Sequence, residues 1–300
     1  MLIKWLYFIL GMIFVLHGCR PAEETPPLTD APGVLTEMAQ TPKPVVYFGV
    51  ISRYHPVVMY EEYLPIMHYL TAQTPYRFEL KLGKNYEEAV SDLEKGVTQI
   101  ASLGAVTYVE AHSRFGALPI VRPLNEHGEP FYRSVIIVRN DSDIQRLTDL
   151  RGRSFAFASL HSTSGNLFGR SVLAEAGIDL QNLDRYHNFQ HHDQVVKAVL
   201  SGEFDAGSVK DVVAFKYQSK GLRLLHFSEP IPSVPFVVRP DASNDFVKAV
   251  KNALLQIDPS RSEYTALTAN WNEEFKYGFI ETSVGDYEPI RKMLNAIPER

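Results

Sequence analysis

Cysteine is almost absent from this sequence of 300 residues, since Cys19 is the only one. A single cysteine excludes an intramolecular disulfide and a zinc site built on cysteines. No run of lysine and arginine occurs and the net charge is −5, so we expect no nucleic-acid partner. The motifs Gly-x-Ser-x-Gly, His-Glu-x-x-His and Gly-x-x-x-x-Gly-Lys are also missing, so no motif predicts an enzyme. The hydrophobic content of 45% is nevertheless typical of a globular protein with a core.

The first 19 residues have the features of a secretory signal peptide. Lys4 gives one positive charge, and the stretch from Trp5 to Leu16 is almost wholly apolar. Its end, at Gly18-Cys19, resembles the cleavage box of bacterial lipoproteins, in which the cysteine becomes lipidated and N-terminal. An uncleaved membrane anchor is the alternative, but the apolar run is short for a membrane span. We therefore expect an extracytoplasmic protein, in the periplasm or at the cell surface, anchored to a bacterial membrane through Cys19.

The folded part is expected to begin near residue 45. Residues 20–44 are rich in proline, threonine, glutamate and alanine without periodicity, which predicts a flexible tether. The apolar stretch 45–51 predicts a buried strand, 76–82 predicts a second strand, and the pattern between them is helical. Strands that alternate with helices favour an α/β fold with a mainly parallel sheet.

A unit of helix, glycine, strand and helix occurs twice in the sequence. The first copy begins at Tyr86 and its first helix ends at Gly96, whereas the second copy begins at His192 and its helix ends at Gly202. Superposing the two glycines pairs Tyr86 with His192 and also pairs the serines of the two following strands. The repeat predicts two similar lobes, each of which offers one ring side chain at the start of a helix.

Two proline-containing stretches, 129–134 and 231–235, precede short apolar strands and are plausible crossings between the lobes. The chain would then form lobe 1 from residues 45–132 and 239–300, and lobe 2 from residues 133–238. The helical tail after residue 245 would complete lobe 1.

The stretch Ser162-Thr163-Ser164-Gly165 lies where an alternating strand pattern gives way to a helical one. At such a junction several backbone N–H groups are unpaired, and the helix dipole presents its positive end. The hydroxyl groups add further donors, and Gly165 allows the backbone to come close to a ligand. This arrangement suits a small oxyanion. An ordinary Ser/Thr helix cap is the alternative.

Together with other motifs, this stretch resembles the periplasmic substrate-binding proteins of phosphonate, phosphite and phosphate ABC transporters (the PhnD type). The motifs are Ser162–Gly165, His192-Asp193, Asp205–Val209, Pro230–Pro232, Tyr132–Val138 and Tyr86 after Gly83-Lys84-Asn85. The resemblance implies a type II periplasmic-binding-protein fold, in which two α/β lobes joined by two crossover strands close on the ligand.

The resemblance also implies which residues bind the ligand. Ser162, Thr163, Ser164, Gly165 and His192 would hold the oxyanion, and two tyrosines would complete the pocket. Those tyrosines are Tyr86 and Tyr132. Further candidates are Ser102, Gly104 and Lys210. A protonated His192 would donate from both ring nitrogens and couple affinity to pH.

The ligand expected from this sequence is a compact oxyanion such as phosphate, phosphite or a small alkyl phosphonate. Members of the family that bind aminoalkyl phosphonates place acidic side chains against the ammonium group, whereas the matching positions here carry Val212 and Val234. A buried ammonium group without a counter-charge would be strongly disfavoured. The charge of Lys210 favours an extra anionic group on the ligand or none, unless this lysine faces solvent.

Other functions remain open at this point. Lobe closure could be read by an ABC permease or by a membrane sensor kinase, and the same fold could bind a sulfonate or another organic anion. The histidines His187, His191 and His192 suggest zinc, but no carboxylate or fourth ligand lies at a suitable spacing. We expect no metal, no cofactor and a monomeric protein.

Overall fold

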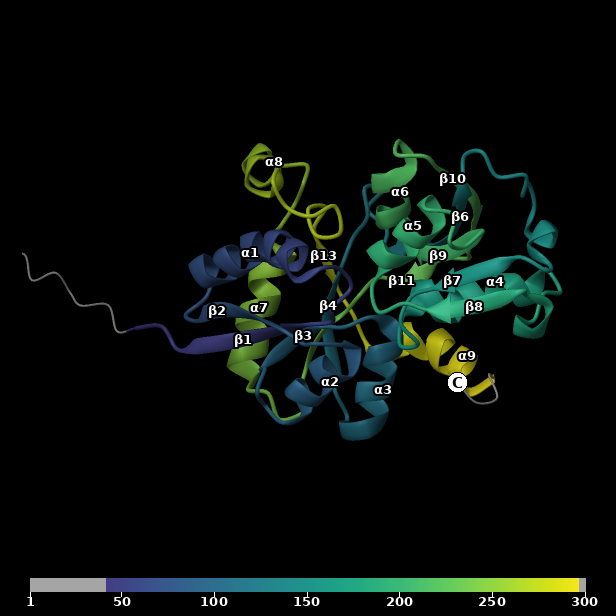
Figure 1. Ribbon diagram of the computed structural model, residues 1–300. Coiled ribbons are helices and arrows are strands. Elements are labelled where there is room, and N and C mark those ends of the chain that lie inside the picture. The colour runs from purple at the N-terminus through teal and green to yellow at the C-terminus, as the bar shows by residue number, and fades with distance from the viewer. Residues whose placement is uncertain (1–41, 297–300) are drawn as a thin grey trace, which may run out of the picture. The chain divides into compact units, whose positions relative to one another are not determined.

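Two β-sheets, each covered by helices on both faces, make up the folded part of the chain (Figure 1). The computed structural model describes residues 42–296. The predicted signal peptide with Cys19 and residues 20–41 of the predicted tether lie outside these residues. Within the described part, no helix is both long and apolar enough to cross a membrane.

Lobe 1 is built on a six-stranded sheet with the order β13-β4-β12-β3-β1-β2. Its strands are β1 (Val45–Val50), β2 (Arg77–Leu82), β3 (Ile100–Ser102), β4 (Leu118–Pro123), β12 (Phe236–Val238) and β13 (Phe279–Glu281). Strands β2 and β3 run parallel to β1, so that Leu82 and Ser102 both lie beside Val50 at one edge. The carboxyl ends of these parallel strands therefore meet where the loops to the following helices begin.

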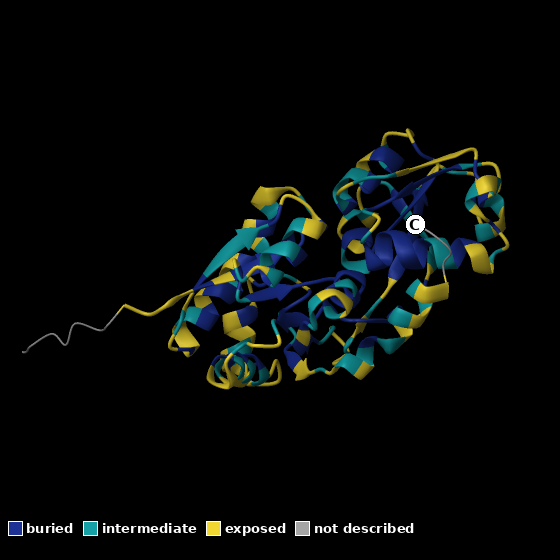
Figure 2. Cartoon of the chain, turned by 90° about the horizontal axis from the view of Figure 1, so that it is seen from below, coloured by how far each residue is buried: buried dark blue, intermediate teal, exposed yellow. Residues whose placement is uncertain are grey.

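Helices cover both faces of this sheet, and each face forms its own hydrophobic cluster. One face carries α1 (Pro56–Gln73) and α7 (Asn244–Leu255), and the other carries α2 (Tyr86–Glu94), α3 (Ala105–Phe115) and α9 (Glu288–Ala296). Helix α8 (Ser262–Thr268) precedes a loop that leads to β13. Buried strands lie inside the lobe, and exposed residues lie on its outer helices (Figure 2).

Lobe 2 is built on a five-stranded sheet with the order β10-β6-β9-β7-β8. Its strands are β6 (Ser134–Arg139), β7 (Ser154–Phe157), β8 (Arg185–Asn188), β9 (Ala206–Lys210) and β10 (Leu222–Phe227). Its helices are α4 (Gly169–Glu175), which follows a π-helical turn η2 (Thr163–Phe168), α5 (His192–Leu200) and α6 (Asp211–Gln218). Gly177, with φ of 71°, follows the last turn of α4 and its cap residue Ala176.

The chain crosses between the lobes twice, through β5 (Phe131–Tyr132) and β11 (Ile231–Pro232), which pair antiparallel to each other. After the second crossing, β12 pairs with β3 and β4 in the sheet of lobe 1. Residues 236–238 are therefore part of lobe 1, and the predicted end of lobe 2 at residue 238 lies too far along the chain. The apolar character of β12 did not distinguish a last strand of lobe 2 from a returning strand of lobe 1.

The predicted repeat extends further than the sequence pattern suggested. Tyr86 and His192 are the first residues of α2 and α5, as the superposition required. Gly96 and Gly202 both have positive φ, of 70° and 78°, which a residue with a side chain rarely adopts. Each glycine lies against an arginine at the end of an antiparallel strand of its own sheet: Arg239 directly follows β12, and Arg139 is the last residue of β6. The two lobes thus share a local structure as well as a pattern.

Candidate functional site

The hydroxyl stretch forms a tight turn at the junction between β7 and α4. The side chain of Ser162 caps this turn, because its Oγ accepts a hydrogen bond from the backbone N–H of Gly165 at 3.0 Å. A Cβ atom on Gly165 would lie 2.3 Å from the Cβ of Ala158 and 2.8 Å from Cε1 of His192. Gly165 is therefore required for the close approach of this turn to β7 and α5. All four residues of the stretch are buried.

His192 is buried behind Ser162 and is held in one neutral form. Its Nδ1 accepts a hydrogen bond from the backbone N–H of Lys210 at 3.3 Å, and its Nε2 lies 3.2 Å from Ser162 Oγ. With Nδ1 as an acceptor, the ring proton is on Nε2 and points at Ser162. Burial, together with the positive charges of Arg53 and Lys210, lowers the pKa of His192 to about 3. The condition for donation from both nitrogens, a protonated ring, is therefore not met here, because the backbone N–H of Lys210 donates to one of them.

The arrangement around Ser162 leaves its proton available. Its Oγ already accepts from Gly165 and, in this tautomer, from His192. The O–H of Ser162 is consequently not used in either contact, and the hydroxyl of Tyr86 lies next to it.

Thr163 reaches across to lobe 1. Its Oγ1 accepts a hydrogen bond from the backbone N–H of Val106 at 3.0 Å, in the first turn of α3. Gly104, at the N-cap of α3, lies beside the same hydroxyl, since an added Cβ would be 3.5 Å from Thr163 Oγ1. The strand-to-helix junction of lobe 1, at Gly104, therefore lies opposite that of lobe 2, at Thr163.

The two predicted tyrosines lie against this cluster. Tyr86 is buried, and its Oη makes no hydrogen bond with any described residue. Burial raises the pKa of Tyr86 to about 12, which the nearby charge of Arg53 and the Ser162 hydroxyl partly offset. Burial also raises the pKa of Tyr132 well above its usual value, and the Thr163 hydroxyl opposes this rise. Both phenols are therefore neutral donors at physiological pH.

Ser164 and Ser102 have supporting contacts in this structure. The carbonyl oxygen of Ser164 accepts hydrogen bonds from the hydroxyls of Ser134 and Ser208, at 2.7 and 2.9 Å, and these fix the turn on the sheet of lobe 2. Ser102 Oγ lies 3.1 Å from the hydroxyl of Tyr63. Tyr63 in turn accepts a hydrogen bond from Arg53. Ser102 is therefore linked to Arg53 through the hydroxyl of Tyr63.

A buried group of charges that the sequence did not reveal adjoins the hydroxyl cluster. Arg53 Nη1 lies 2.6 Å from Glu274 Oε2, and Lys210 Nζ contacts the other carboxylate oxygen of Glu274. The exposed fractions are 3% for Arg53, 8% for Glu274 and 4% for Lys210. Lys210 also lies over the ring of Tyr132, with Nζ 4.2 Å from the centroid. Its alternative as a solvent-facing lysine is wrong, because Glu274 compensates its charge inside the protein.

The charges of this group stabilise one another against burial. Burial alone would raise the pKa of Glu274, but Arg53 and Lys210 outweigh it and hold the pKa below its usual value. Burial lowers the pKa of Lys210, and Glu274 opposes that shift. Two positively charged side chains, Arg53 and Lys210, thus lie beside the hydroxyl and ring donors that the sequence predicted. The position of Arg53 after β1 is a signal that sequence analysis could have used, whereas Glu274 offered none.

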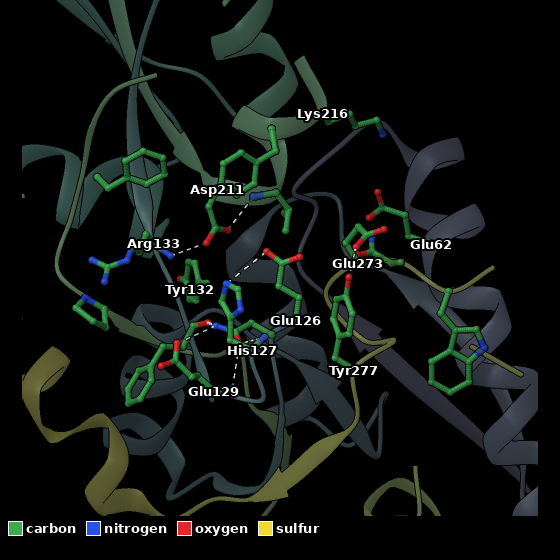
Figure 3. A pocket seen from close by; sticks show the side chains of 18 of the residues that line it. Glu62, Glu126, His127, Glu129, Tyr132, Arg133, Asp211, Lys216, Glu273 and Tyr277 are labelled. Carbon is green, nitrogen blue, oxygen red and sulfur yellow. Dashed lines mark hydrogen bonds and ion pairs between the residues drawn. The ribbon is translucent and has the colours of Figure 1, made fainter. Parts of the chain in front are cut away.

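A cavity of about 1290 Å³ lies beside the cluster, between α1 and the loop after α8 on one side and α6 on the other. Figure 3 shows Tyr132 at its wall, with the carboxylates of Glu62 and Glu273 on one side and Asp211 on the other. Val212 lines this cavity as well, whereas Val234 is buried in the core of lobe 1. The hydroxyl stretch, Tyr86 and His192 do not line it. We take the cluster as the candidate ligand site, because the buried hydroxyl of Tyr86, which has no hydrogen-bond partner among the described residues, lies there beside Ser162.

Metal ligands are not grouped in the described residues. Between residues 42 and 296, no three of the His, Cys, Asp and Glu side chains lie close enough together to hold a metal ion. His191, one of the three histidines considered for zinc, directs its Nδ1 to the carbonyl oxygen of Ser52 at 2.8 Å.

Comparisons with known proteins agree with this architecture. A family model described as "ABC transporter, phosphonate, periplasmic substrate-binding protein" matches residues 48–287. A probable ABC transporter phosphite binding protein of Prochlorococcus marinus is 23% identical over 257 residues, which cover 79% of each chain. The phosphonates-binding periplasmic protein of Escherichia coli is 24% identical over 216 residues, or 68% of this chain and 64% of that protein.

Solved structures share the fold. A Prochlorococcus marinus protein in complex with methylphosphonate has a TM-score of 0.74 at 22% identity and covers 86% of this chain and 100% of its own. A binding protein component of a Pseudomonas aeruginosa phosphonate transporter has a TM-score of 0.75 at 22% identity, with coverages of 84% and 86%. The chain therefore belongs to the family of periplasmic substrate-binding proteins of phosphonate ABC transporters and is an extracytoplasmic binding protein rather than an enzyme.

Proposed function

We propose that this protein captures a small phosphorus oxyanion between its two lobes and delivers it to an ABC permease. The ligand is phosphate, phosphite or an alkyl phosphonate. Ser162, Thr163 and Ser164 bind it from lobe 2, and Gly165 and His192 hold the hydroxyl of Ser162 in place. Tyr86 binds it from lobe 1, and Tyr132 binds it from the crossing strand.

The observation that carries this proposal is the buried hydroxyl of Tyr86, which has no acceptor among the described residues and lies beside the hydroxyl of Ser162. A buried phenol without an acceptor is costly, and an anion placed between the lobes would accept from it. Hydrogen bonds to a charged oxygen are about twice as strong as those between neutral groups. Both lobes would then contribute to one ligand, which favours the closed form.

The charges at the border of the cluster support an anion over a cation. Arg53 and Lys210 are both buried, and among the described residues both pair with Glu274. The carboxylate of Glu274 is engaged by these two cations and offers no free oxygen to an ammonium group. Weak binding of aminoalkyl phosphonates nevertheless stays a prediction for the binding test, because the carboxylates of Glu62, Asp211 and Glu273 in the adjoining cavity would favour an ammonium group.

Ligand identity is tested by thermal shift and calorimetry on the purified protein. The probes are phosphate, phosphite, methylphosphonate, aminoethylphosphonate, sulfate and methanesulfonate. We expect stabilisation by at least one of the first three, and methylphosphonate is the first choice because a relative was solved with it. Stabilisation by the sulfonate alone, or by zinc alone, would contradict the proposal.

The site residues are tested by the Ser162→Ala variant. Loss of one hydrogen bond to a charged oxygen should weaken binding by about 1.5–3 kcal/mol. The matched control is Ser219→Ala, on the exposed end of α6, which should bind as the unchanged protein does. Equal affinities of both variants would place the ligand elsewhere.

Transport and anchoring need separate tests. Deletion of the gene should abolish uptake of the ligand by cells, whereas a protein that serves a sensor kinase would leave uptake intact and change gene expression. Metabolic labelling with a radioactive fatty acid should mark the protein and not its Cys19→Ala variant. Gel filtration with light scattering checks the expected monomer.

A further inference from the structure

The carboxylate of Glu274 forms ion pairs with two cations that come from different lobes. Arg53 belongs to the loop between β1 and α1, and Lys210 is the last residue of β9 in lobe 2. Glu274 lies in the loop between α8 and β13. Its Oε2 lies 2.6 Å from Arg53 Nη1, and its Oε1 contacts Lys210 Nζ. Glu274 thus occupies the position from which a carboxylate or a second phosphoryl group of a ligand would contact Arg53 and Lys210.

The surroundings of this group also disfavour a second anionic charge. Beyond Tyr132 the space opens into the side cavity, whose lining includes Glu62, Asp211 and Glu273 (Figure 3). One buried oxygen of Glu62 has no hydrogen-bond partner among the described residues. An anionic substituent that left the hydroxyl cluster in this direction would meet more carboxylates than cations. The lining carries six carboxylates against two cationic side chains, Arg133 and Lys216; the carboxylates are those of Glu61, Glu62, Glu126, Glu129, Asp211 and Glu273.

We propose that Glu274 is a specificity-determining residue that restricts the site to ligands with one anionic group. It does so by pairing with Arg53 and Lys210, which would otherwise bind a ligand carboxylate. This inference rests on the proposed function, since it concerns which phosphorus oxyanions that site accepts. Like charges brought together without compensation cost several kcal/mol, and specificity of this kind commonly arises from such repulsion.

The test compares methylphosphonate with phosphonoacetate, which carries the same phosphonate group and an added carboxylate. In the unchanged protein we expect phosphonoacetate to bind at least 100-fold more weakly than methylphosphonate by calorimetry. In Glu274→Gln, phosphonoacetate should gain at least tenfold relative to methylphosphonate, because Arg53 and Lys210 are then free to bind its carboxylate. Glu274→Asp, which keeps the charge, should restore the discrimination against phosphonoacetate.

Glu281→Gln is the matched control. Glu281 is also a carboxylate of lobe 1, but its side chain is 63% exposed, pairs with Lys251 and does not line the cavity. Its replacement should leave the ratio of the two affinities within about twofold of the unchanged protein. A similar change in both variants would point to general charge effects and would overturn the specific role of Glu274.

Glu274→Gln leaves two buried cations without a counter-charge and can fail to fold. The double variant Lys210→Met with Glu274→Gln removes one cation together with the carboxylate and leaves Arg53 free. It should show the same relative gain for phosphonoacetate, and an unchanged ratio in this folded variant would overturn the inference. Equal binding of both ligands by the unchanged protein would also overturn it, whereas binding of neither would contradict the proposed function itself.

Discussion

The Nδ1 atom of His192 accepts a hydrogen bond from the backbone N–H of Lys210, at 3.3 Å. This contact fixes the tautomer of His192, and the Nε2–H faces Ser162 at 3.2 Å. The same residue, Lys210, places its side-chain charge near the ring and helps to lower the pKa of His192. One neighbour therefore makes His192 a single donor rather than a charged double donor.

The first prediction concerns pH. Because the folded-state pKa of His192 is about 3 and an unfolded histidine titrates near 6.5, the unfolded state binds more protons between these values. Stability is therefore complete above about pH 6.5 and falls as the pH is lowered toward 3, by about 4–5 kcal/mol in total from this group. Denaturant unfolding at several pH values measures this loss, and His192→Gln should reduce the dependence.

The same pKa predicts the behaviour of the ring in solution. In an NMR titration the ring signals of His192 should not shift between pH 5 and 8. Ligand affinity should accordingly show no step that depends on His192 in this range. A midpoint near 6.5 for His192 would contradict the neutral form.

The second prediction concerns Tyr86. Tyr86→Phe should change the free energy of unfolding by less than about 1 kcal/mol, because the removed hydroxyl is buried without a partner. It should nevertheless weaken methylphosphonate binding about 10-fold or more, since a hydrogen bond to a charged oxygen contributes about 1.5–3 kcal/mol.

Tyr108→Phe is the control for this prediction. The hydroxyl of Tyr108 is likewise buried without a partner, but its ring packs on Tyr287, on the side of α3 that faces α9. This variant should leave both stability and affinity almost unchanged. If Tyr108→Phe weakened binding as much as Tyr86→Phe, the effect would not report a ligand contact.

The third prediction concerns Gly165. Gly165→Ala should destabilise the protein by about 1–3 kcal/mol, because its Cβ would lie 2.3 Å from the Cβ of Ala158 and neither backbone can move freely. Gly285→Ala is the control, since its Cβ would meet no atom closer than 3.7 Å. Thermal unfolding of the two variants is the measurement, and equal melting temperatures would show that the turn tolerates a side chain.

The fourth prediction concerns Arg53. Arg53→Met should destabilise the protein by about 3–5 kcal/mol, because it breaks a buried pair and leaves Glu274 with Lys210 alone. Arg77→Met removes an exposed pair with Glu79 and should cost less than about 1 kcal/mol. Chemical denaturation measures both, and a small effect of Arg53→Met would mean that solvent reaches the buried group.

Much of the architecture could be predicted from the sequence, because local patterns determine it. The alternation of apolar strands and helices, the helix ends at Gly96 and Gly202, and the hydroxyl turn at Ser162 each depend on residues close together in the chain. These patterns, with the resemblance they support, were sufficient for the two-lobed fold and the family. The boundary near residue 238 was wrong because a strand's own sequence does not say which sheet it joins.

The charges and protonation of the site were decided by the tertiary structure alone. Arg53 and Glu274 are 221 residues apart in the chain, so no local spacing could pair them. The pKa of His192 follows from burial and from two cations that the fold brings to it, and neither can be read from its neighbours in sequence. The sequence determined which donors are present, whereas packing determined which of them stay free, because a hydrogen bond or ion pair depends on distance in space.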